Sequence, residues 1–460
     1  MAVKEKALNT LSLTTERVAE LLGVSESAVK RLSQKLEEPD WLLAQRLEAF
    51  GRFQALPAPS PETDEDWRRT KAFDAGFFSQ PIPTLDPVEA RRAEALHTEL
   101  RALELSDGGA SGLLLEQHLV GTHRFLTEAL ERSGVILTDI STAAREYPQL
   151  VRKYVAPTAS DDSKFEALCR ALFTSGVFIY VPAGVKVPLP IWTGLYADAD
   201  GSLVLPRSIV VAEPGSEVTV FEEHLSPNGV GATAASALHE VFVGEDARVT
   251  VVSLQYWGQT VRAFASHRLH IQRGGSLTSL VASLGGAVTK AFVRANLLGP
   301  GAESQMFGLL FGRAKQHFDH STIQDHFAPH TTSNLLYRAA LRDESRSVYS
   351  GLIRVRPEAV RADAYQANRN LILSKEARAD SLPKLEIETD DVRCTHGATV
   401  GPVDEEQTFY LMSRGLPRAE AERMIVEGFF EDVITSAREE RVQNSIRRRL
   451  LKAMQETNRD

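Results

Sequence analysis

The sequence predicts a mainly β protein built as a stacked β-solenoid. From about Gly176 to Met412 the chain alternates between apolar or alternating strand segments and short turns of small and charged residues. The turns are Glu213–Glu217, Gly244–Arg248, Arg273–Ser276, Gly299–Glu303, Arg342–Arg346 and Ser374–Arg378. A period of roughly 25 to 45 residues, made of strands that alternate every second residue, is typical of stacked coils. Such coils present flat ladders of side chains and open ends, which suit partner docking better than an enclosed pocket does.

Composition narrows the class of protein. A chain of 460 residues has room for two or three domains. The net charge of −9 disfavours a nucleic-acid partner, because such proteins need a basic excess. Two cysteines, Cys169 and Cys394, fit a reducing compartment. The chain begins without a signal-like apolar segment, and its most apolar stretch, 176–192, is interrupted by prolines and a lysine. We therefore expect a cytoplasmic protein without a membrane span.

Three regions differ in their sequence pattern. Residues 1–173 are predicted to form an N-terminal helical or α+β domain, with short β segments such as 134–138 and a proline-rich linker near 56–83. Residues 174–412 form the β core, and 413–460 return to a helical pattern with an apolar stripe from Ala419 to Ile434. Helical domains at both ends would cover strand edges that a solenoid otherwise exposes.

One N-terminal segment has two interpretations. Thr15–Leu32 resembles a helix-turn-helix, with Ala19, Gly23 and Val29 where that motif packs and turns. In a metal-sensing regulator, Ser25–Arg31 would enter the major groove of DNA. The same pattern also fits an amphipathic helical pair that packs on its own domain, and the acidic chain favours this second interpretation.

The motifs of common enzymes are missing from the sequence. It contains no Walker A pattern, no G-x-S-x-G elbow, no H-E-x-x-H helix and no C-x-x-C pair. We therefore expect a non-enzymatic subunit and assign any ATP hydrolysis to a partner. A carbohydrate-active β-helix enzyme is an alternative, but the sequence offers Trp192, Tyr256 and Trp257 without repeated acidic pairs.

A run of histidines is a first candidate for metal binding. Within fourteen residues lie His317, His320, His326 and His330. Imidazoles are good ligands for transition metals. On a strand, however, His320 and His326 share one face while His317 points the other way. A polar ladder, in which the imidazoles form hydrogen bonds across the rungs, is the favoured interpretation. Cys169, between apolar neighbours, is expected to be a packing residue.

The second candidate is the tripeptide Cys394-Thr-His396. Residues i and i+2 of a strand point to the same side, about 6.6 Å apart, so the thiol and the imidazole can face one ligand. These donors suit iron or zinc. Because they supply only half a coordination sphere, a metal would need further ligands from another chain. A buried thiol beside a structural histidine remains the alternative.

Several segments resemble the SufB/SufD family of iron–sulfur cluster assembly proteins. They are Glu38–Leu43, Thr174–Ile191, Tyr365–Leu373, Cys394–Gly401 and Asp404–Leu416. Together these segments span most of the chain, and the last motif is the most specific. The resemblance implies a right-handed parallel β-helix flanked by helical domains, in agreement with the strand and turn pattern.

Within the family the pattern is similar to the SufD type rather than the SufB type. Where SufB-type chains have a cysteine on the strand before the final motif, this chain reads Asn368–Leu371. By resemblance, His396 matches the SufD histidine implicated in cluster assembly, and Cys394 matches the thiol at the interface with SufB. The resemblance thus implies a transient iron–sulfur cluster that is shared with SufB.

The resemblance also implies partners. They are a SufB-like paralogue, which pairs through the β-helix, and a SufC-like ABC ATPase, which binds the ATP and docks on the C-terminal helices. The partner-binding residues would be Arg414, Gly415, Leu416, Phe429 and Phe430; aromatic residues often anchor interfaces. The same helix can instead pack on its own β-helix. The type of cluster, a reduced flavin in the complex, and a homodimer formed without SufB remain open.

Overall fold

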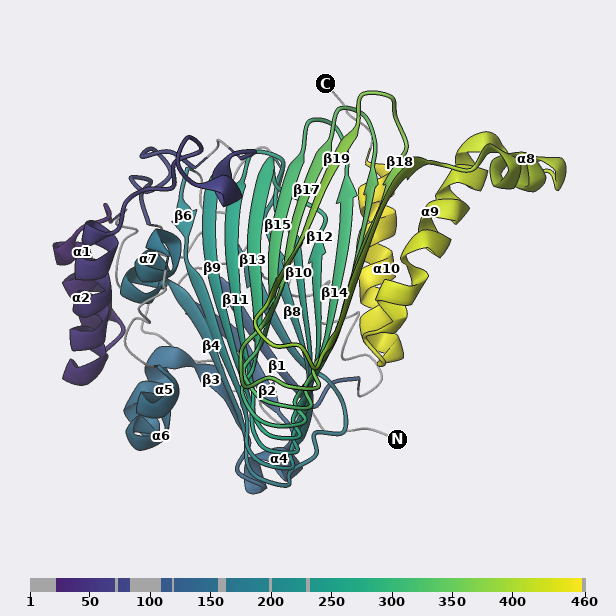
Figure 1. Ribbon diagram of the computed structural model, residues 1–460. Helices are drawn as coiled ribbons and strands as arrows, with labels where there is room; N and C mark the ends of the chain where they lie inside the picture. Colours follow the sequence, from purple (N-terminus) through teal and green to yellow (C-terminus); the bar gives the residue numbers. More distant parts are fainter. Residues whose placement is uncertain are drawn as a thin grey trace, which may run out of the picture.

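The chain forms a parallel β-solenoid with helices on both outer faces, which confirms the predicted fold class (Figure 1). The computed structural model describes residues 22–70, 73–82, 109–117, 120–155, 163–197, 201–228 and 232–456. The first sheet has the order β2 (Val120–Leu126), β1 (Gly112–Gln117), β5 (Ile191–Tyr196), β8 (Glu217–Leu225), β10 (Arg248–Tyr256), β12 (Ser276–Ser283), β14 (Glu303–Gly312), β16 (Thr332–Leu341), β18 (Asp363–Ile372) and β20 (Arg393–Pro402).

The second sheet faces the first across the interior. Its order is β19 (Arg378–Ile387), β17 (Arg346–Val355), β15 (His317–His326), β13 (Val288–Leu297), β11 (Arg262–Ile271), β9 (Ala234–Val243), β7 (Pro206–Ala212), β4 (Ser175–Val181) and β3 (Ile136–Asp139), with β6 (Leu203–Val204) beside β9. The chain crosses from one sheet to the other after each strand of the stack, so every coil adds one strand to each sheet. Three strands that precede Gly176, namely β1, β2 and β3, join the same two sheets.

The turns between coils stack as regularly as the strands. At one corner, the residue with a positive φ in each turn donates its backbone N–H to a carbonyl of the next coil. These residues are Gly215, Asp246, Gly274, Gly301, His330 and Arg361. The predicted turns Arg342–Arg346 and Ser374–Arg378 lie at the opposite corner, between β16 and β17 and between β18 and β19. The sequence therefore identified the turns correctly as a class, but the structure divides them between two corners.

Side chains alternate between the interior and the outer faces. In the second sheet, Val241 and Leu269 stack in the apolar core. Glu240 and Arg268, one residue earlier in each strand, face outward and bind α7 (Lys164–Leu172). Arg170 of α7 donates to Glu240 at 2.9 Å, and Arg268 donates to Glu166 of α7 at 2.7 Å. In one ion pair the acid belongs to the sheet, and in the other it belongs to α7. Together they hold the helix against the solenoid.

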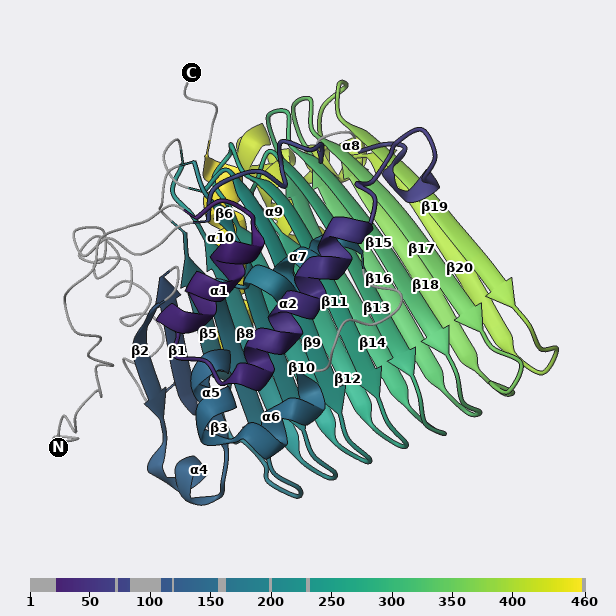
Figure 2. The same ribbon diagram turned by 90° about the vertical axis from the view of Figure 1, so that its left-hand side faces the viewer.

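Most of the N-terminal helices cover the outer face of the second sheet, as Figure 2 shows. They are α1 (Glu26–Lys35), α2 (Asp40–Ala55), the single 3₁₀ turn η1 (Glu65–Trp67), α5 (Ile140–Glu146), α6 (Pro148–Tyr154) and α7. The short helix α4 (Glu128–Arg132) instead lies at one end of the strands, and its Leu130 joins the interior cluster. In α1, Ala28, Val29 and Leu32 are buried in the core shared with α2 and α7. This burial supports the packing interpretation of the helix-turn-helix-like segment, of which residues 15–21 lie outside the described residues.

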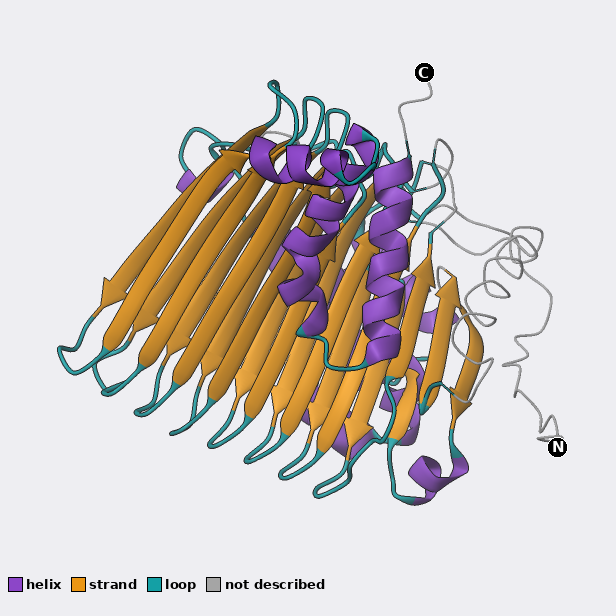
Figure 3. Ribbon diagram, turned by 90° about the vertical axis from the view of Figure 1, so that its right-hand side faces the viewer, coloured by secondary structure: helices purple, strands orange, loops and turns teal. Residues whose placement is uncertain are grey.

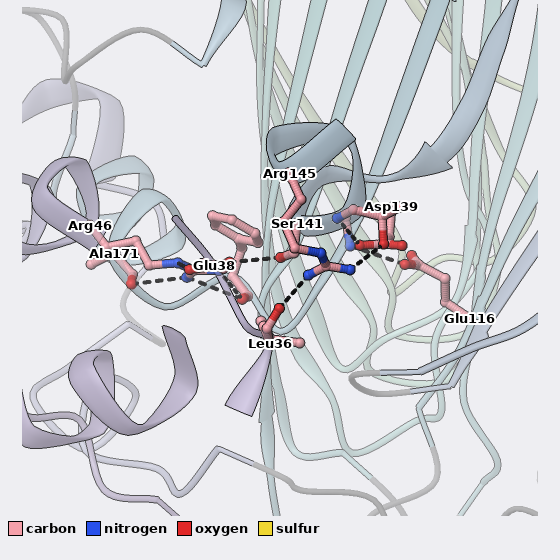
Figure 4. A network of polar contacts seen from close by, with 11 residues as sticks. Leu36, Glu38, Arg46, Glu116, Asp139, Ser141, Arg145 and Ala171 are labelled. Carbon is pink, nitrogen blue, oxygen red and sulfur yellow. Dashed lines mark hydrogen bonds and ion pairs between the residues drawn. The ribbon is translucent and has the colours of Figure 1, made fainter. Parts of the chain in front are cut away.

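A buried ion pair holds the α1–α2 turn in place (Figure 4). The carboxylate of Glu38 accepts two hydrogen bonds from Arg46, both at 2.7 Å, and one from Ser141 at 2.7 Å. Arg46 also donates to the carbonyl of Ala171 at the end of α7, at 3.1 Å, and its guanidinium lies over the ring of Phe173. One pair of opposite charges therefore connects α2, α5 and α7.

The C-terminal helices lie on the other side of the molecule. They are α8 (Glu405–Ser413), α9 (Arg418–Thr435) and α10 (Glu440–Gln455), and Figure 3 shows α9 and α10 along the outer face of the first sheet. Their apolar residues, including Val426, Phe430 and Ile446, share one buried cluster with Phe221 and Leu254 of that face. By contrast, α8 projects away from the solenoid (Figure 1).

We expect Arg46→Met to lower the free energy of unfolding by about 3–5 kcal/mol, because it leaves the fully buried charge of Glu38 without its partner. The double variant Glu38→Leu with Arg46→Met should recover most of this loss, since it removes both charges together. Denaturant unfolding of the three proteins measures the effect. Equal stability of the single variant and the original chain would contradict the role given to this pair.

Candidate functional site

Cys394 and His396 lie on β20, the terminal strand of the first sheet. β20 pairs only with β18, where Cys394 is opposite Ala364 and His396 is opposite Gln366. Both partner residues are buried in the interior, whereas Tyr365 between them is exposed. Since in-register parallel strands keep matching residues on the same face, the thiol and the imidazole both face the interior side. The structure thus places the pair on one face of its strand, at the end of the stack.

This end of the solenoid is open. Leu385 and Ile387 of β19 are 38% and 42% exposed, and Val400 of β20 is 51% exposed. The residues at the matching positions one coil earlier, Ile353 and Val355, are fully buried. Residues at matching positions of successive coils form columns of side chains inside the solenoid. In the last coil, positions that are buried in the coil before it become exposed. An apolar end with unpaired strand edges is a surface that other chains readily cover.

The two candidate ligands have different surroundings. Cys394 is half-buried and packs on the apolar cluster that includes Ile353 and Ala362. Burial, together with the nearby charge of Asp363, raises the pKa of the Cys394 thiol. The thiol is therefore protonated at neutral pH and must release its proton to bind a metal. His396 is exposed.

With the other described residues, the pair does not form a complete metal site. Within the parts of the chain that the structure describes, no group of three or more His, Cys, Asp or Glu side chains is arranged to hold a metal ion. Among the described residues, Cys394 and His396 are therefore not part of a larger group of metal ligands.

The histidine run does not converge on one point. His320 lies inside the solenoid with its Nε2 3.1 Å from the hydroxyl of Ser283, and burial lowers its pKa to about 3. His326 contacts the hydroxyls of Thr331 and Ser333 at 2.7 and 2.8 Å. His317 contacts the hydroxyl of Thr70 at 2.9 Å. His330 lies outside the strand, in the next turn at a φ of 60°.

The hydrogen-bonding interpretation of these histidines therefore fits the structure. His320 and His326 lie on β15 of the second sheet, while Ser283 lies on β12 and Ser333 on β16 of the first sheet, so these bonds also cross the interior. Cys169 is fully buried among apolar residues, and burial raises the pKa of its thiol to about 12, which fits a packing role.

Sequence reasoning missed a second polar cluster inside the solenoid. Glu222 of β8 lies 2.7 Å from His239 of β9 and 3.2 Å from His224, and the rings of His239 and His267 stack with their centroids 4.3 Å apart. Burial alone would raise the pKa of Glu222, but His239 and His224 outweigh it and hold that pKa well below its usual value. In the sequence, only the pair Glu222-x-His224 on one face of a strand could have indicated this cluster. The folded structure brings His239 and His267 to it.

The predicted partner-binding residues have unequal access to solvent. Arg414 is exposed at the end of α8, where its guanidinium lies 5.3 Å from the ring of Tyr410, and Gly415 adopts a φ of 95°. Phe430, in contrast, is fully buried against the outer face of the first sheet, and Phe429 is partly buried there. For these two residues the structure favours packing on the chain's own solenoid.

The exposed aromatic residues of this region belong to α8. Phe409 and Tyr410 are 72% and 57% exposed, and the sequence analysis did not select either of them. Phe409 and Tyr410 lie in a short helix between the last strand and the turn at Arg414. The sequence of such a helix does not show which of its sides packs against the rest of the protein. α8 packs against α9, and its remaining surface is open.

The aromatic residues that suggested a sugar-binding groove are inside the protein. Trp192, Tyr256 and Trp257 are all buried. A carbohydrate-active site needs aromatic faces that a substrate can reach, so these residues do not support that alternative.

Comparison with known proteins identifies the family. The model of the SUF system FeS cluster assembly SufBD core domain matches residues 195–429, and that of the SufBD protein N-terminal region matches residues 111–192. The chain belongs to the SufBD family. The iron–sulfur cluster assembly protein SufD of Bacillus subtilis is 31% identical over 90% of this chain and 94% of its own length. A SufBD family protein of Staphylococcus saprophyticus is 28% identical, over 89% of this chain and 88% of its own.

Membership confirms the resemblance that the motifs showed and supports a role in iron–sulfur cluster assembly. The core model covers the solenoid from the end of β5 to β20 and continues through α8 into α9, and Cys394 and His396 lie within that range. None of the helices described is long and apolar enough to span a membrane.

The buried carboxyl of Glu116 should make stability depend on pH. Burial raises its pKa to about 8, although the N–H of Gly176 donates to it at 3.2 Å. The folded protein therefore holds a proton that the unfolded chain releases above about pH 4.5, so this group destabilises the fold as pH rises from there to 8.

We expect Glu116→Gln to stabilise the protein more at pH 8 than at pH 5, because the amide stays neutral at both values. Urea unfolding at the two pH values measures the difference. The same change in stability at both would contradict a protonated Glu116 in the folded state.

Proposed function

We propose that this chain is a SufD-like subunit of a SufBCD scaffold for iron–sulfur cluster assembly. Its open solenoid end pairs with a SufB-like chain, and a transient cluster forms at the seam between them. The observation that carries the proposal is the position of Cys394 and His396 at the C-terminal solenoid end, where core positions become exposed. Without the SufB-like chain, the same apolar end is available to a second copy of this chain.

The ligand set of the seam is mixed. This chain contributes an imidazole and a thiol, and the partner contributes thiolate ligands. A neutral imidazole holds iron less firmly than a thiolate does, which suits a scaffold that must release its cluster. Because the Cys394 thiol has a raised pKa, its binding to iron is coupled to the loss of a proton.

The C-terminal helices have the form of a docking arm on a fixed base. The base is α10 and the second half of α9: Arg338 of β16 donates to the carbonyl of Phe429 and to Asp432, and Arg449 donates to Glu223 of β8 at 2.6 Å. The arm is α8 with the turn at Arg414, Gly415 and Leu416. We propose that a SufC-like ATPase docks on this arm and that ATP is bound only by that partner.

A substitution at His396 tests the seam. His396→Ala should reduce cluster formation in the reconstituted three-protein complex about tenfold or more, because it removes a ligand. The complex should still assemble, since the alanine leaves the apolar end intact. The absorbance of the reconstituted cluster measures the first effect and co-purification the second. His330→Ala, which changes an exposed histidine in a turn, is the control. Undiminished cluster formation by His396→Ala would remove His396 from the mechanism.

Substitutions in α8 test the arm. The double variant Phe409→Ala with Tyr410→Ala should weaken ATPase binding about tenfold or more, because exposed aromatic residues dominate interfaces of this kind. Calorimetric titration measures the affinity, and thermal unfolding should be unchanged. Tyr147→Ala, an exposed aromatic residue on the N-terminal side, is the control. Phe430→Ala should instead destabilise the fold by about 3–5 kcal/mol. Wild-type ATPase affinity of the double variant would place docking elsewhere.

A further inference from the structure

The interior directly beneath His396 is filled by one amide side chain. Gln366 of β18 is the strand partner of His396, lies on the same face, and is only 1% exposed. Neighbouring strands lie about 4.8 Å apart, so the backbone of Gln366 lies one strand spacing below that of His396. It is the last fully enclosed residue of this interior column, since His396 above it is exposed.

Gln366 connects the first sheet to the second. Its amide nitrogen donates to the carbonyl of Gly351 on β17 at 3.3 Å and lies 3.5 Å from the carbonyl of Lys384 on β19. Its amide oxygen lies 3.5 Å from the hydroxyl of Tyr349, which in turn contacts the hydroxyl of Thr322 at 3.0 Å. These polar contacts reach from β18 to two strands of the opposite sheet, including the terminal one.

This arrangement depends on the absence of a side chain at position 351. A Cβ atom at Gly351 would lie 2.3 Å from the hydroxyl oxygen of Tyr349 and 2.4 Å from the amide oxygen of Gln366. Neither distance is possible for real atoms. Gly351 has no positive φ, so the glycine serves the space and not a special backbone conformation.

We propose that Gln366 is a positioning residue for His396, supported by Tyr349 and Gly351. The amide occupies the space into which the imidazole would otherwise turn, so the ring faces the open end. It also ties β18 to β17 and β19, which fixes the width of the opening between the two terminal strands. The proposal rests on the function proposed for His396, and it adds the residue that holds this ligand ready for a shared cluster.

The test compares two neighbouring residues of one strand. Gln366→Leu keeps the volume but loses the polar contacts, and it should reduce cluster formation in the reconstituted complex about tenfold, as is usual for residues that orient a metal ligand. Asn368→Leu is the matched control: Asn368 is buried on the same face, and its column ends at Ala398 instead of His396. It should cost similar stability but leave cluster formation unchanged.

A second measurement does not depend on the cluster. Gln366→Leu should change the orientation of the His396 ring in the free protein, because the ring loses the amide that limits its position. NMR contacts between the ring protons and the protons of β17 and β18, recorded at one fixed pH, measure this orientation. Tyr365→Leu, on the outer face of the same strand, should leave these contacts unchanged.

The outcomes separate this inference from the proposed function. If His396→Ala forms clusters normally, the proposed function of the seam fails whatever Gln366 does. If His396→Ala fails but Gln366→Leu forms clusters as well as Asn368→Leu, the positioning role is overturned and the proposed function stands. An unchanged orientation of the His396 ring in Gln366→Leu would also overturn it, because the two side chains would not be neighbours.

Discussion

Parallel, in-register stacking of coils is the constraint on which the rest of this structure depends. Each strand of the solenoid obtains its backbone hydrogen bonds from the coils before and after it, and each interior side chain obtains its cover in the same way. Because every coil pairs in the same way with the next, the repeat itself does not end the stack. At the N-terminal end the antiparallel strands β2 and β3 and the helices near them finish the sheets. At the C-terminal end the last coil is left with its core partly exposed.

The same constraint explains the location of the candidate site. A ligand pair on an internal coil would be enclosed by neighbours on both sides and could not meet a second molecule. On β20, Cys394 and His396 keep the inward direction of their columns but lack the coil that would cover them. Both side chains therefore lie at an uncovered end of the stack, which is the reason we propose a shared site there.

Charged side chains fasten the helical parts to this stack on both faces. On the second sheet, Glu240 and Arg268 exchange ion pairs with α7, and on the first sheet Arg338 and Arg449 hold α9 and α10. Buried or half-buried pairs of this kind define one docking geometry, since each charge is costly to leave unpaired. These pairs hold the helices against the sheets. Among the described residues no ion pair joins α8 to a sheet, and α8 is the helix that projects.

The sequence by itself determined the solenoid, the turns and the placement of Cys394 and His396 on one strand face. These are local properties: they follow from a two-residue strand period and from turn residues that recur along the chain. It also supplied the motifs from which the family was inferred. Only the tertiary structure decided which residues meet across the interior, such as Glu222 with His239, and which are stacked in successive coils, such as Gln366 and His396. It also decided that Phe430 is buried while Phe409 is exposed. Contacts between coils depend on which coils are neighbours, and a pattern that repeats in every coil does not specify the neighbour. The packing of a helix depends likewise on the surface that it meets in the folded protein.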